Sequence, residues 1–325
     1  MIFDVARHKF SEGLITLMLF AFVSLIAALA SGDVVAVEGG APLQGVVQQF
    51  AISHSVLSAL LVFPVLIYSG LRFARAAVRI GLYSASSLGL LALGGVAMFA
   101  IMSSANYFSL MVIVLLASEL LGRLLYCLGQ DMQLGYLFTA MLSMGIMPLV
   151  DSSLIPFALL MLLVVIVVRG TVREGIIALV GVALPAFIYC YIVWLLGGDF
   201  SQSFVDIWDV SELLIDNGLL LPYLTLPRLV FLGVTLFMVI CSLIAYYGVR
   251  VSLLDSSRVV WRTLIAMVFI LVAMLVFLPS ASPAVVAILV LVMTIMLPQL
   301  FIRIDVITAT ILYLIWVVSA LATLF

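Results

Sequence analysis

The chain has 325 residues, of which 67% are hydrophobic and only 9% charged, and its mean hydropathy is +1.44. Soluble domains carry about 25% charged residues, so this composition excludes an ordinary water-soluble protein. The apolar runs are continuous and do not alternate, which disfavours a membrane β-barrel and predicts an all-α, polytopic transmembrane helix bundle. A net charge of −2 without any basic tract gives no indication of a nucleic-acid partner. We expect residues 1–325 to form one integral membrane domain.

Eleven apolar segments follow one another along the chain, and we expect each of them to cross the membrane. They are residues 14–30, 50–70, 82–101, 108–121, 135–150, 154–168, 175–196, 229–247, 264–278, 284–297 and 306–324. Several are shorter than the roughly 20 residues of a straight crossing, so their polar flanks must contribute to the span. The first segment ends in Ala28-Leu29-Ala30-Ser31, which also resembles a signal-peptide cleavage site. We interpret it as a retained first span, since either interpretation gives the same orientation.

The basic residues are sorted between alternate ends of these segments. Twelve of the thirteen lie at the amino end or after the second, fourth, sixth, eighth and tenth segments: Arg7, Lys9, Arg72, Arg75, Arg79, Arg123, Arg169, Arg173, Arg250, Arg258, Arg262 and Arg303. The opposite loops hold only Arg228. The positive-inside rule therefore predicts an amino end in the cytoplasm and a carboxyl end outside. We expect a multi-pass protein of the bacterial inner (cytoplasmic) membrane.

One long polar stretch, residues 197–228, lies between the seventh and eighth segments. It carries five acids and ends in its single cation, Arg228; the acids are Asp199, Asp206, Asp209, Glu212 and Asp216. Loop acids are usually solvated, and here they also reinforce the topology by avoiding the cytoplasmic face. We expect an extracytoplasmic loop; if the protein is a subunit of a complex, a helix around residues 210–221 would offer the docking surface for a protein partner.

Ionisable residues inside spans are functional hypotheses by default. Glu119 lies within the fourth segment, one turn before Arg123, and the simpler interpretation is an i,i+4 ion pair. The absence of an acid near the middle of a span counts against an ion-driven transporter. Arg72, Arg75 and Arg79 have helical spacing and should lie on one helix face. They are most simply topology anchors that attract anionic lipid, with a phosphate-binding site as the alternative.

Other features predict packing. Gly94-Gly95 should permit a close contact between helices. An aromatic belt at the membrane borders is expected from Trp194, Trp208, Trp261, Trp316, Tyr107 and Tyr247. The three cysteines lie in or beside apolar runs, so no disulfide framework is implied. Two histidines without clustered ligands give no support for a metal site, and we expect no cofactor.

Polar residues also gather at the extracytoplasmic ends of the segments. Asp33 and Glu38 follow the first span, His54 opens the second, and Asp151 lies at the turn between the fifth and sixth. Together with Tyr223 and Arg228, they offer a carboxylate base and a phosphate-binding cation for a lipid headgroup. The simpler interpretation is that the acids are solvated and that His54 is a hydrogen-bonded interface residue.

Two resemblances extend this interpretation. The stretch from Ile52-Ser53-His54-Ser55 to Arg173-Glu174, followed by GIIALVGVALPAF, resembles a family of uncharacterised multi-span inner-membrane proteins from Bacteroidota. More distantly, the many helices and the acid directly after the first span are similar to membrane glycosyltransferases that use polyprenyl-phosphate sugars. That resemblance implies a catalytic acid/base role for Asp33 and places Arg228 against the lipid phosphate.

The leading hypothesis is a membrane protein that handles a lipid-linked glycan at the outer face. As an enzyme, it would transfer a sugar from a polyprenyl-phosphate donor, with Asp33 or Glu38 as base and Arg228 on the phosphate. His54, Asp151 and Tyr223 would bind the substrate. Two alternatives stay open: a non-catalytic subunit of an envelope complex that docks through residues 197–228, and a permease or flippase for a lipid or small molecule.

Overall fold

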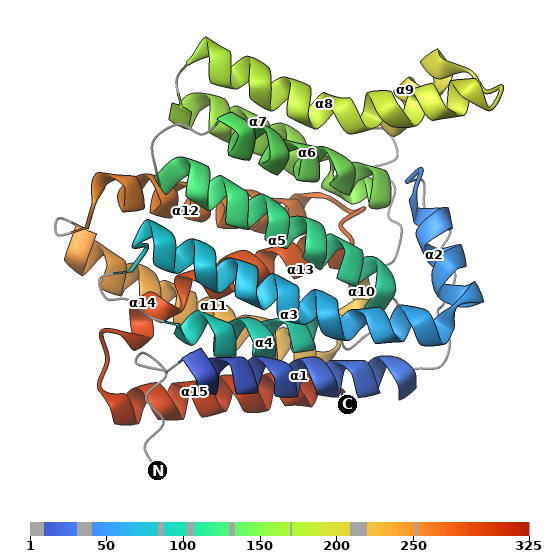
Figure 1. The fold of residues 1–325 in the computed structure, drawn as a ribbon. Coiled ribbons are helices and arrows are strands. Elements are labelled where there is room, and N and C mark those ends of the chain that lie inside the picture. Colours follow the sequence, from blue (N-terminus) through green and yellow to red (C-terminus); the bar gives the residue numbers. More distant parts are fainter. Residues whose placement is uncertain are drawn as a thin grey trace.

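The computed structural model describes residues 10–30, 41–83, 88–102, 107–129, 134–169, 171–208, 220–250 and 253–324. Over these ranges the chain forms helices and no strand (Figure 1). The first half contains α1 (Phe10–Ala30), α2 (Gln44–Ser53), α3 (Ser55–Ile80), α4 (Gly89–Met102), α5 (Tyr107–Gly129), α6 (Leu134–Val150) and α7 (Ile155–Arg169). The second half contains α8 (Val172–Leu195), α9 (Phe200–Ile207), α10 (Leu220–Tyr223), α11 (Leu226–Val249), α12 (Asp255–Phe277), α13 (Pro283–Met296), α14 (Pro298–Phe301) and α15 (Val306–Leu321).

Eight helical stretches in the described residues are long and apolar enough to cross a membrane, and they identify a polytopic membrane protein. They are residues 10–30, 55–80, 107–128, 172–195, 226–249, 255–277, 283–301 and 306–324. Three shorter apolar helices, α4, α6 and α7, coincide with the remaining expected segments. Each of the eleven apolar runs of the sequence therefore contains a helix, and eight of these helical stretches have the length of a full span.

The long helices lie side by side and run in alternating directions (Figure 1). We call the end of the bundle where α1 begins the N-side end, and the end where α15 finishes the C-side end. Arginines of the described chain concentrate at the N-side end, because they lie in the later part of α3 and α5, at the end of α7, in the early part of α8 and α12, and in the links that follow α11 and precede α15. Arg228, at the start of α11, lies at the C-side end.

The core is centred on α13, in which every residue from Ala284 to Met296 is buried. The helices α4, α5, α11 and α12 contact α13, while α1, α8 and α15 lie at the margin of the bundle and keep one face exposed (Figure 1). An apolar face left exposed over a span's length is suited to lipid. The bundle thus has a protein-enclosed centre and a lipid-compatible perimeter.

Glycines allow α1 to pack closely on its neighbours. A Cβ on Gly95 of α4 would lie 3.0 Å from the Cα of Leu17 in α1, and one on Gly70 of α3 would lie 2.8 Å from the Leu17 side chain. Leu17 is fully buried at this junction. The expectation of a close helix contact at Gly95 is confirmed, and α1 is an integral part of the bundle.

Two of the tryptophans assigned to an aromatic belt are core residues instead. Trp261 and Trp316 are fully buried; their indole N–H groups donate to the carbonyl of Leu82 at 3.1 Å and to Oγ1 of Thr235 at 2.8 Å. Trp194, by contrast, is 54% exposed, as a belt residue should be. The belt prediction was wrong for Trp261 and Trp316 because a buried indole with a hydrogen-bond partner is stable inside protein as well as at an interface.

Several charged segments expected to be loops are helical. Arg258 and Arg262 lie on α12, which begins at Asp255, and Arg123 lies inside α5. The Arg258 guanidinium pairs with Asp255 three residues before it at 3.0 Å. Arginine is a good helix former, so a helix continues past the apolar run until a turn residue ends it. Gly81, in the left-handed conformation with φ of 63°, ends α3 in this way.

Candidate functional site

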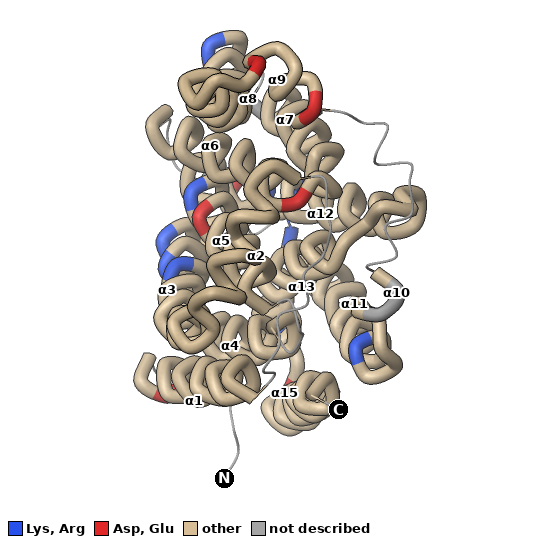
Figure 2. Tube along the Cα trace, turned by 90° about the vertical axis from the view of Figure 1, so that its right-hand side faces the viewer, with Lys and Arg blue, Asp and Glu red and all other residues tan. Residues whose placement is uncertain are grey.

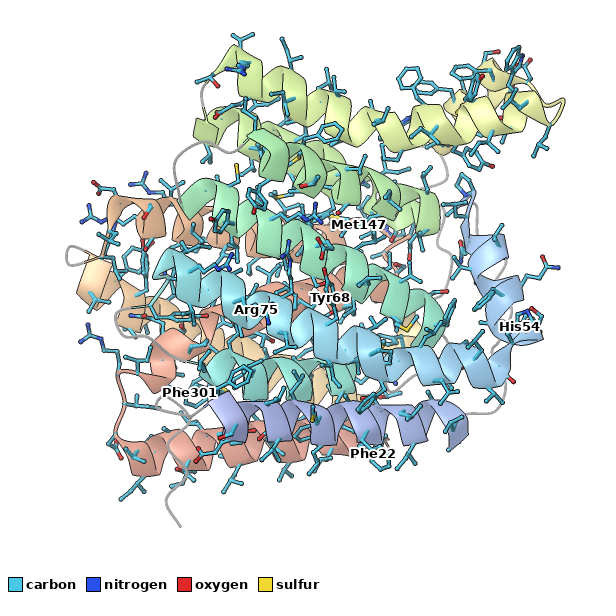
Figure 3. The ribbon with its side chains drawn as sticks, in the orientation of Figure 1. Phe22, His54, Tyr68, Arg75, Met147 and Phe301 are labelled. Carbon is cyan, nitrogen blue, oxygen red and sulfur yellow. The ribbon has the colours of Figure 1, made fainter. Side chains whose placement is uncertain are left out.

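Three arginines lie on one face of α3 near its N-side end. Arg72, Arg75 and Arg79 are spaced at i, i+3 and i+7 within one uninterrupted helix, which confirms the expected common face. Arg75 and Arg79 are exposed, while Arg72 is half-buried between α3 and α5. Figure 3 shows Arg75 and Tyr68 on the same helix, with His54 at its far end.

Glu119 of α5 is the counter-ion of this face. Its Oε2 lies 2.5 Å from Nε of Arg123, one turn later on α5, and 3.5 Å from Nη2 of Arg72 on α3. The hydroxyl of Tyr68 donates to Oε1. The i,i+4 pair with Arg123 confirms the sequence interpretation, and the shorter distance makes Arg123 the principal partner. Arg72 is therefore the less compensated of the two arginines.

A pocket of about 160 Å³ opens beside these residues. Its walls come from α3, α5 and α6 and comprise Arg72, Arg75, Ala76, Arg79, Gly122, Tyr126 and Tyr136. The rings of Tyr126 and Tyr136 lie 4.7 Å apart at 59° and form one wall. Three guanidinium groups and two phenols thus surround a space of small-ligand size.

The pocket is electropositive. Its three lining arginines carry three positive charges, Arg123 behind them adds a fourth, and Glu119 supplies one negative charge. Within the described ranges, Arg75 and Arg79 have no acidic partner at ion-pair distance. Arginines that converge without compensating acids are suited to anions, and phosphate in particular takes bidentate hydrogen bonds from guanidinium.

Gly122 gives Arg72 its place in the pocket. A Cβ at Gly122 would lie 3.0 Å from Cγ and 3.2 Å from Nε of Arg72, so any other residue there would require the Arg72 side chain to shift by a few tenths of an ångström. In this position Nε of Arg72 is buried and has no hydrogen-bond partner. A buried donor without an acceptor carries a desolvation cost that an acceptor in the pocket would relieve.

The pocket lies on the perimeter of the bundle. Figure 2 looks along the helices, and there the basic positions of α3 and α5 gather at one edge. The exposed stripe of α3 continues from these arginines towards the C-side end as Tyr68, Pro64, Leu60 and Leu57. Leu60 and Leu57 are each about half exposed, at 51% and 49%. A basic pocket with an apolar track beside it therefore faces the space that lipid occupies around a membrane bundle.

Two of the residues expected at the extracytoplasmic face, Tyr223 and Arg228, pack on each other. The Arg228 guanidinium carbon lies 4.3 Å from the centre of the Tyr223 ring, and Nη1 donates to the Tyr223 carbonyl at 2.8 Å. The Tyr223 hydroxyl donates to the carbonyl of Ile101 at 3.3 Å, and burial raises the pKa of Tyr223 to about 12, against a smaller opposing effect of Arg228. This arrangement stabilises the α10–α11 corner.

Asp151 lies in a hydrogen-bond network at the C-side end. Its Oδ1 accepts from the backbone N–H of Ser153 at 3.0 Å and from the Ser153 hydroxyl at 2.7 Å. Its Oδ2 accepts from the hydroxyl of Ser282 at 2.6 Å. The carboxylate thereby joins the α6–α7 turn to the α12–α13 turn, which is a structural role. Substrate binding by Asp151 stays a prediction.

His54 lies at the break between α2 and α3, exposed, with its ring 5.3 Å from that of Phe50. In Figure 2, α2 and α10 lie apart, so the structure does not bring His54 beside Tyr223 and Arg228. Asp33 and Glu38, expected as catalytic acids, lie outside the described residues, as do residues 209–219 of the expected docking loop. Their roles stay predictions.

The described part of the 197–228 stretch begins with α9, whose N-cap is Asp199. The Asp199 carboxylate accepts from Ser201 and Gln202, and these hydrogen bonds, led by the Ser201 hydroxyl, lower the pKa of Asp199. Phe204 of α9 packs on Phe187 of α8, with ring centres 5.4 Å apart. This segment is therefore anchored on α8.

The sequence predicted the three arginines of the pocket but not the residues of its other walls. Tyr126 and Tyr136 flank the α5–α6 connection, and Gly122 sits among leucines, so no local pattern indicates that they meet the face of α3. The one available signal was the intramembrane Glu119, whose ion pair marks this part of α5.

Among the described residues, no group of three or more His, Cys, Asp or Glu side chains is arranged to hold a metal ion. The three cysteines are free. No family model, no curated protein and no solved structure matches the chain. In the part of the chain that the structure describes, the arginine pocket is the feature whose geometry indicates a ligand.

Proposed function

We propose that this protein binds a lipid with a phosphate-bearing headgroup in the arginine pocket at the N-side end of the bundle. The observation that carries the proposal is the pocket itself, where Arg72, Arg75 and Arg79 line a space of about 160 Å³. Lipid phosphates are the anions that a membrane protein meets at the level of a helix end, and guanidinium groups are suited to bind them.

A lipid is favoured over a soluble anion by what surrounds the pocket. The exposed stripe of α3 is apolar from Tyr68 towards Leu57, so an acyl chain can lie along it while the phosphate stays with the arginines. From Arg75 to Leu57 this stripe extends about 27 Å, at about 1.5 Å for each helical residue, which is close to the thickness of the hydrocarbon layer.

The proposal includes the topology. We propose eleven crossings of the bacterial inner membrane with the N-side end in the cytoplasm, and the concentration of arginines at that end supports this orientation by the positive-inside rule. The pocket would then take its lipid from the cytoplasmic leaflet, whose anionic lipids attract basic residues. A phosphate-bearing lipid is also the ligand that the transferase and the lipid-permease hypotheses have in common.

The test is the binding of phosphatidic acid to the purified protein, measured by native mass spectrometry across a lipid titration. Arg75→Gln combined with Arg79→Gln should weaken binding roughly 30-fold, since each arginine near a membrane surface contributes about 1 kcal/mol towards an anionic lipid. Both side chains are exposed, so their replacement should leave the fold intact.

The matched control is Arg262→Gln combined with Arg303→Gln. These two arginines are exposed, lie at the same end of the bundle and do not line the pocket. The control changes the net charge by the same amount, so it should weaken binding only slightly if the pocket is the site. Equal weakening by the two double variants would refute a specific site in favour of general surface charge.

The transfer of a sugar at the outer face, with Asp33 as base, is a separate hypothesis. Its support is the position of Asp33 directly after the first apolar segment. Asp33→Asn should abolish glycan transfer in membranes at unchanged expression; retained transfer would remove that role from Asp33.

A further inference from the structure

The stereochemistry of Arg72 points to the class of headgroup, an inference that rests on the proposed lipid-binding function. Nη2 of Arg72 lies at the long distance of 3.5 Å from Glu119, while Glu119 is held closely by Arg123 at 2.5 Å and by the Tyr68 hydroxyl. Glu119 can therefore keep its two principal partners when Arg72 turns to another acceptor. Arg72 is therefore the arginine of the pocket that can exchange its contact with Glu119 for a contact with a ligand.

The edge of Arg72 that carries Nε becomes available to an acceptor when the guanidinium turns towards the pocket. Nε is buried, has no hydrogen-bond partner, and lies beside Gly122 on the wall of the pocket. Two donors of one guanidinium, Nε and a terminal nitrogen, form a fork that matches two oxygens of a single phosphate. A ligand phosphate placed there would satisfy the buried donor and take the contact that Glu119 makes weakly.

The two other arginines of the pocket, Arg75 and Arg79, can bind further oxygens of the ligand phosphate. Arg75 and Arg79 line the same pocket one and two turns further along α3. A phosphodiester has two non-bridging oxygens and one negative charge, so the fork of Arg72 would use both oxygens. A terminal phosphate has a third free oxygen and carries a charge of about −1.5 to −2 at neutral pH. The terminal phosphate can therefore occupy the fork with two oxygens and offer a third, unsubstituted oxygen to Arg75 or Arg79, whereas a phosphodiester must share the oxygens that the fork already holds.

We infer that the pocket selects a terminal phosphate monoester, or the terminal phosphate of a diphosphate, over a phosphodiester headgroup, and that Arg72 is the specificity-determining residue. Tyr126 of α5 and Tyr136 of α6 form the other wall of the pocket, with their rings 4.7 Å apart.

The experiment compares phosphatidic acid, a lipid phosphomonoester, with phosphatidylglycerol, a lipid phosphodiester of one charge, by native mass spectrometry of the purified full chain. The wild type should bind phosphatidic acid well over fivefold more tightly, because one further charge near a basic surface gives about fivefold and the third oxygen adds a hydrogen bond to Arg75 or Arg79. Arg72→Lys keeps the charge and the aliphatic stem but removes the fork, so the ratio of the two affinities should fall to the roughly fivefold that charge alone gives; an unchanged ratio would remove the role of Arg72 in specificity. Arg262→Lys, outside the pocket, should leave the ratio unchanged.

Equal affinity of the wild type for the two lipids would overturn the inference about the headgroup. The proposed function would still stand in that case, provided that Arg75→Gln with Arg79→Gln weakened both lipids. Failure of the wild type to bind either lipid would instead overturn the proposed function. Glycerol 3-phosphate distinguishes the source of the phosphate: a soluble phosphomonoester without an acyl chain should not displace phosphatidic acid at equal concentration, and displacement would refute the assignment to a lipid.

Discussion

The guanidinium of Arg72 lies across the backbone of Gly122, where a Cβ would come within 3.2 Å of its Nε. This contact brings α3 and α5 together at the floor of the arginine pocket and holds Arg72 at the pocket wall. Gly122 has no functional group, but it influences anion binding because it determines the position of the Arg72 side chain.

The replacement Gly122→Ala should therefore weaken the binding of phosphatidic acid by about tenfold or more, because the new methyl group displaces Arg72 and its fork. The helix itself should not suffer, since alanine is about 1 kcal/mol more favourable than glycine in a helix interior. Lipid titration and thermal unfolding of the same sample separate the two effects.

Gly135→Ala is the matched control, because a Cβ at Gly135 meets nothing within 4 Å. It should leave lipid binding unchanged. Unaltered binding by Gly122→Ala as well would show that the position of Arg72 over α5 does not matter.

Asp151 and Ser282 should contribute to stability as a coupled pair. Asp151→Ala and Ser282→Ala each remove the 2.6 Å hydrogen bond between two turns, so each should cost about 1.5–3 kcal/mol of unfolding free energy. The double variant should cost less than the sum, by about 0.5 kcal/mol or more, because both changes delete one interaction. A double-mutant cycle of unfolding in detergent measures the coupling; strict additivity would mean that the two turns are not joined through this bond.

Trp261 should behave as a core residue. Trp261→Ala empties a fully buried site stacked on Tyr246 at 4.6 Å and should cost about 3–5 kcal/mol of stability. Trp194→Ala removes an exposed indole and should change stability by only about 0.5 kcal/mol. Thermal unfolding of the two variants distinguishes a core position from a belt position for Trp261. Similar small losses of stability in both variants would show that Trp261 lies at the membrane border and not in the core.

The phenol of Tyr223 should lose its proton at a higher pH than an exposed tyrosine. Burial raises its pKa to about 12, above the value of about 10 of an unfolded tyrosine. Its contribution to stability is therefore fully present below about pH 10 and is lost as the pH rises towards 12. The tyrosinate absorbance of the wild type minus that of Tyr223→Phe should appear near pH 12. A difference signal that develops near pH 10 would show that the phenol is not buried.

The sequence was sufficient to predict the long apolar helices, but neither their full lengths nor the short helices α2 and α9. Each apolar run contains a helix because the backbone in a membrane must satisfy its own hydrogen bonds. The helical continuation of α12 back to Asp255 was missed, since hydropathy falls at Arg258 and Arg262 while helix propensity does not.

The interior of the bundle was harder to predict than its helices. Lipid and protein core are both apolar, so hydropathy cannot distinguish the buried Trp261 from the exposed Trp194. The pocket was predictable only on its α3 face, where the i, i+3, i+7 spacing aligns the arginines. Its remaining walls depend on the tertiary contact of α3 with α5 and α6, which no local pattern encodes.

The most direct test of the account is a photocrosslink from inside the pocket. Benzoylphenylalanine in place of Tyr136, in liposomes with a small fraction of phosphatidic acid, should form adducts enriched in phosphatidic acid over its bulk fraction. Arg75→Gln with Arg79→Gln should abolish the enrichment. The same probe in place of Tyr191, which is 54% exposed on α8, should report the bulk composition. Adducts at position 136 that merely follow the bulk composition would contradict a phosphate-binding pocket at this site.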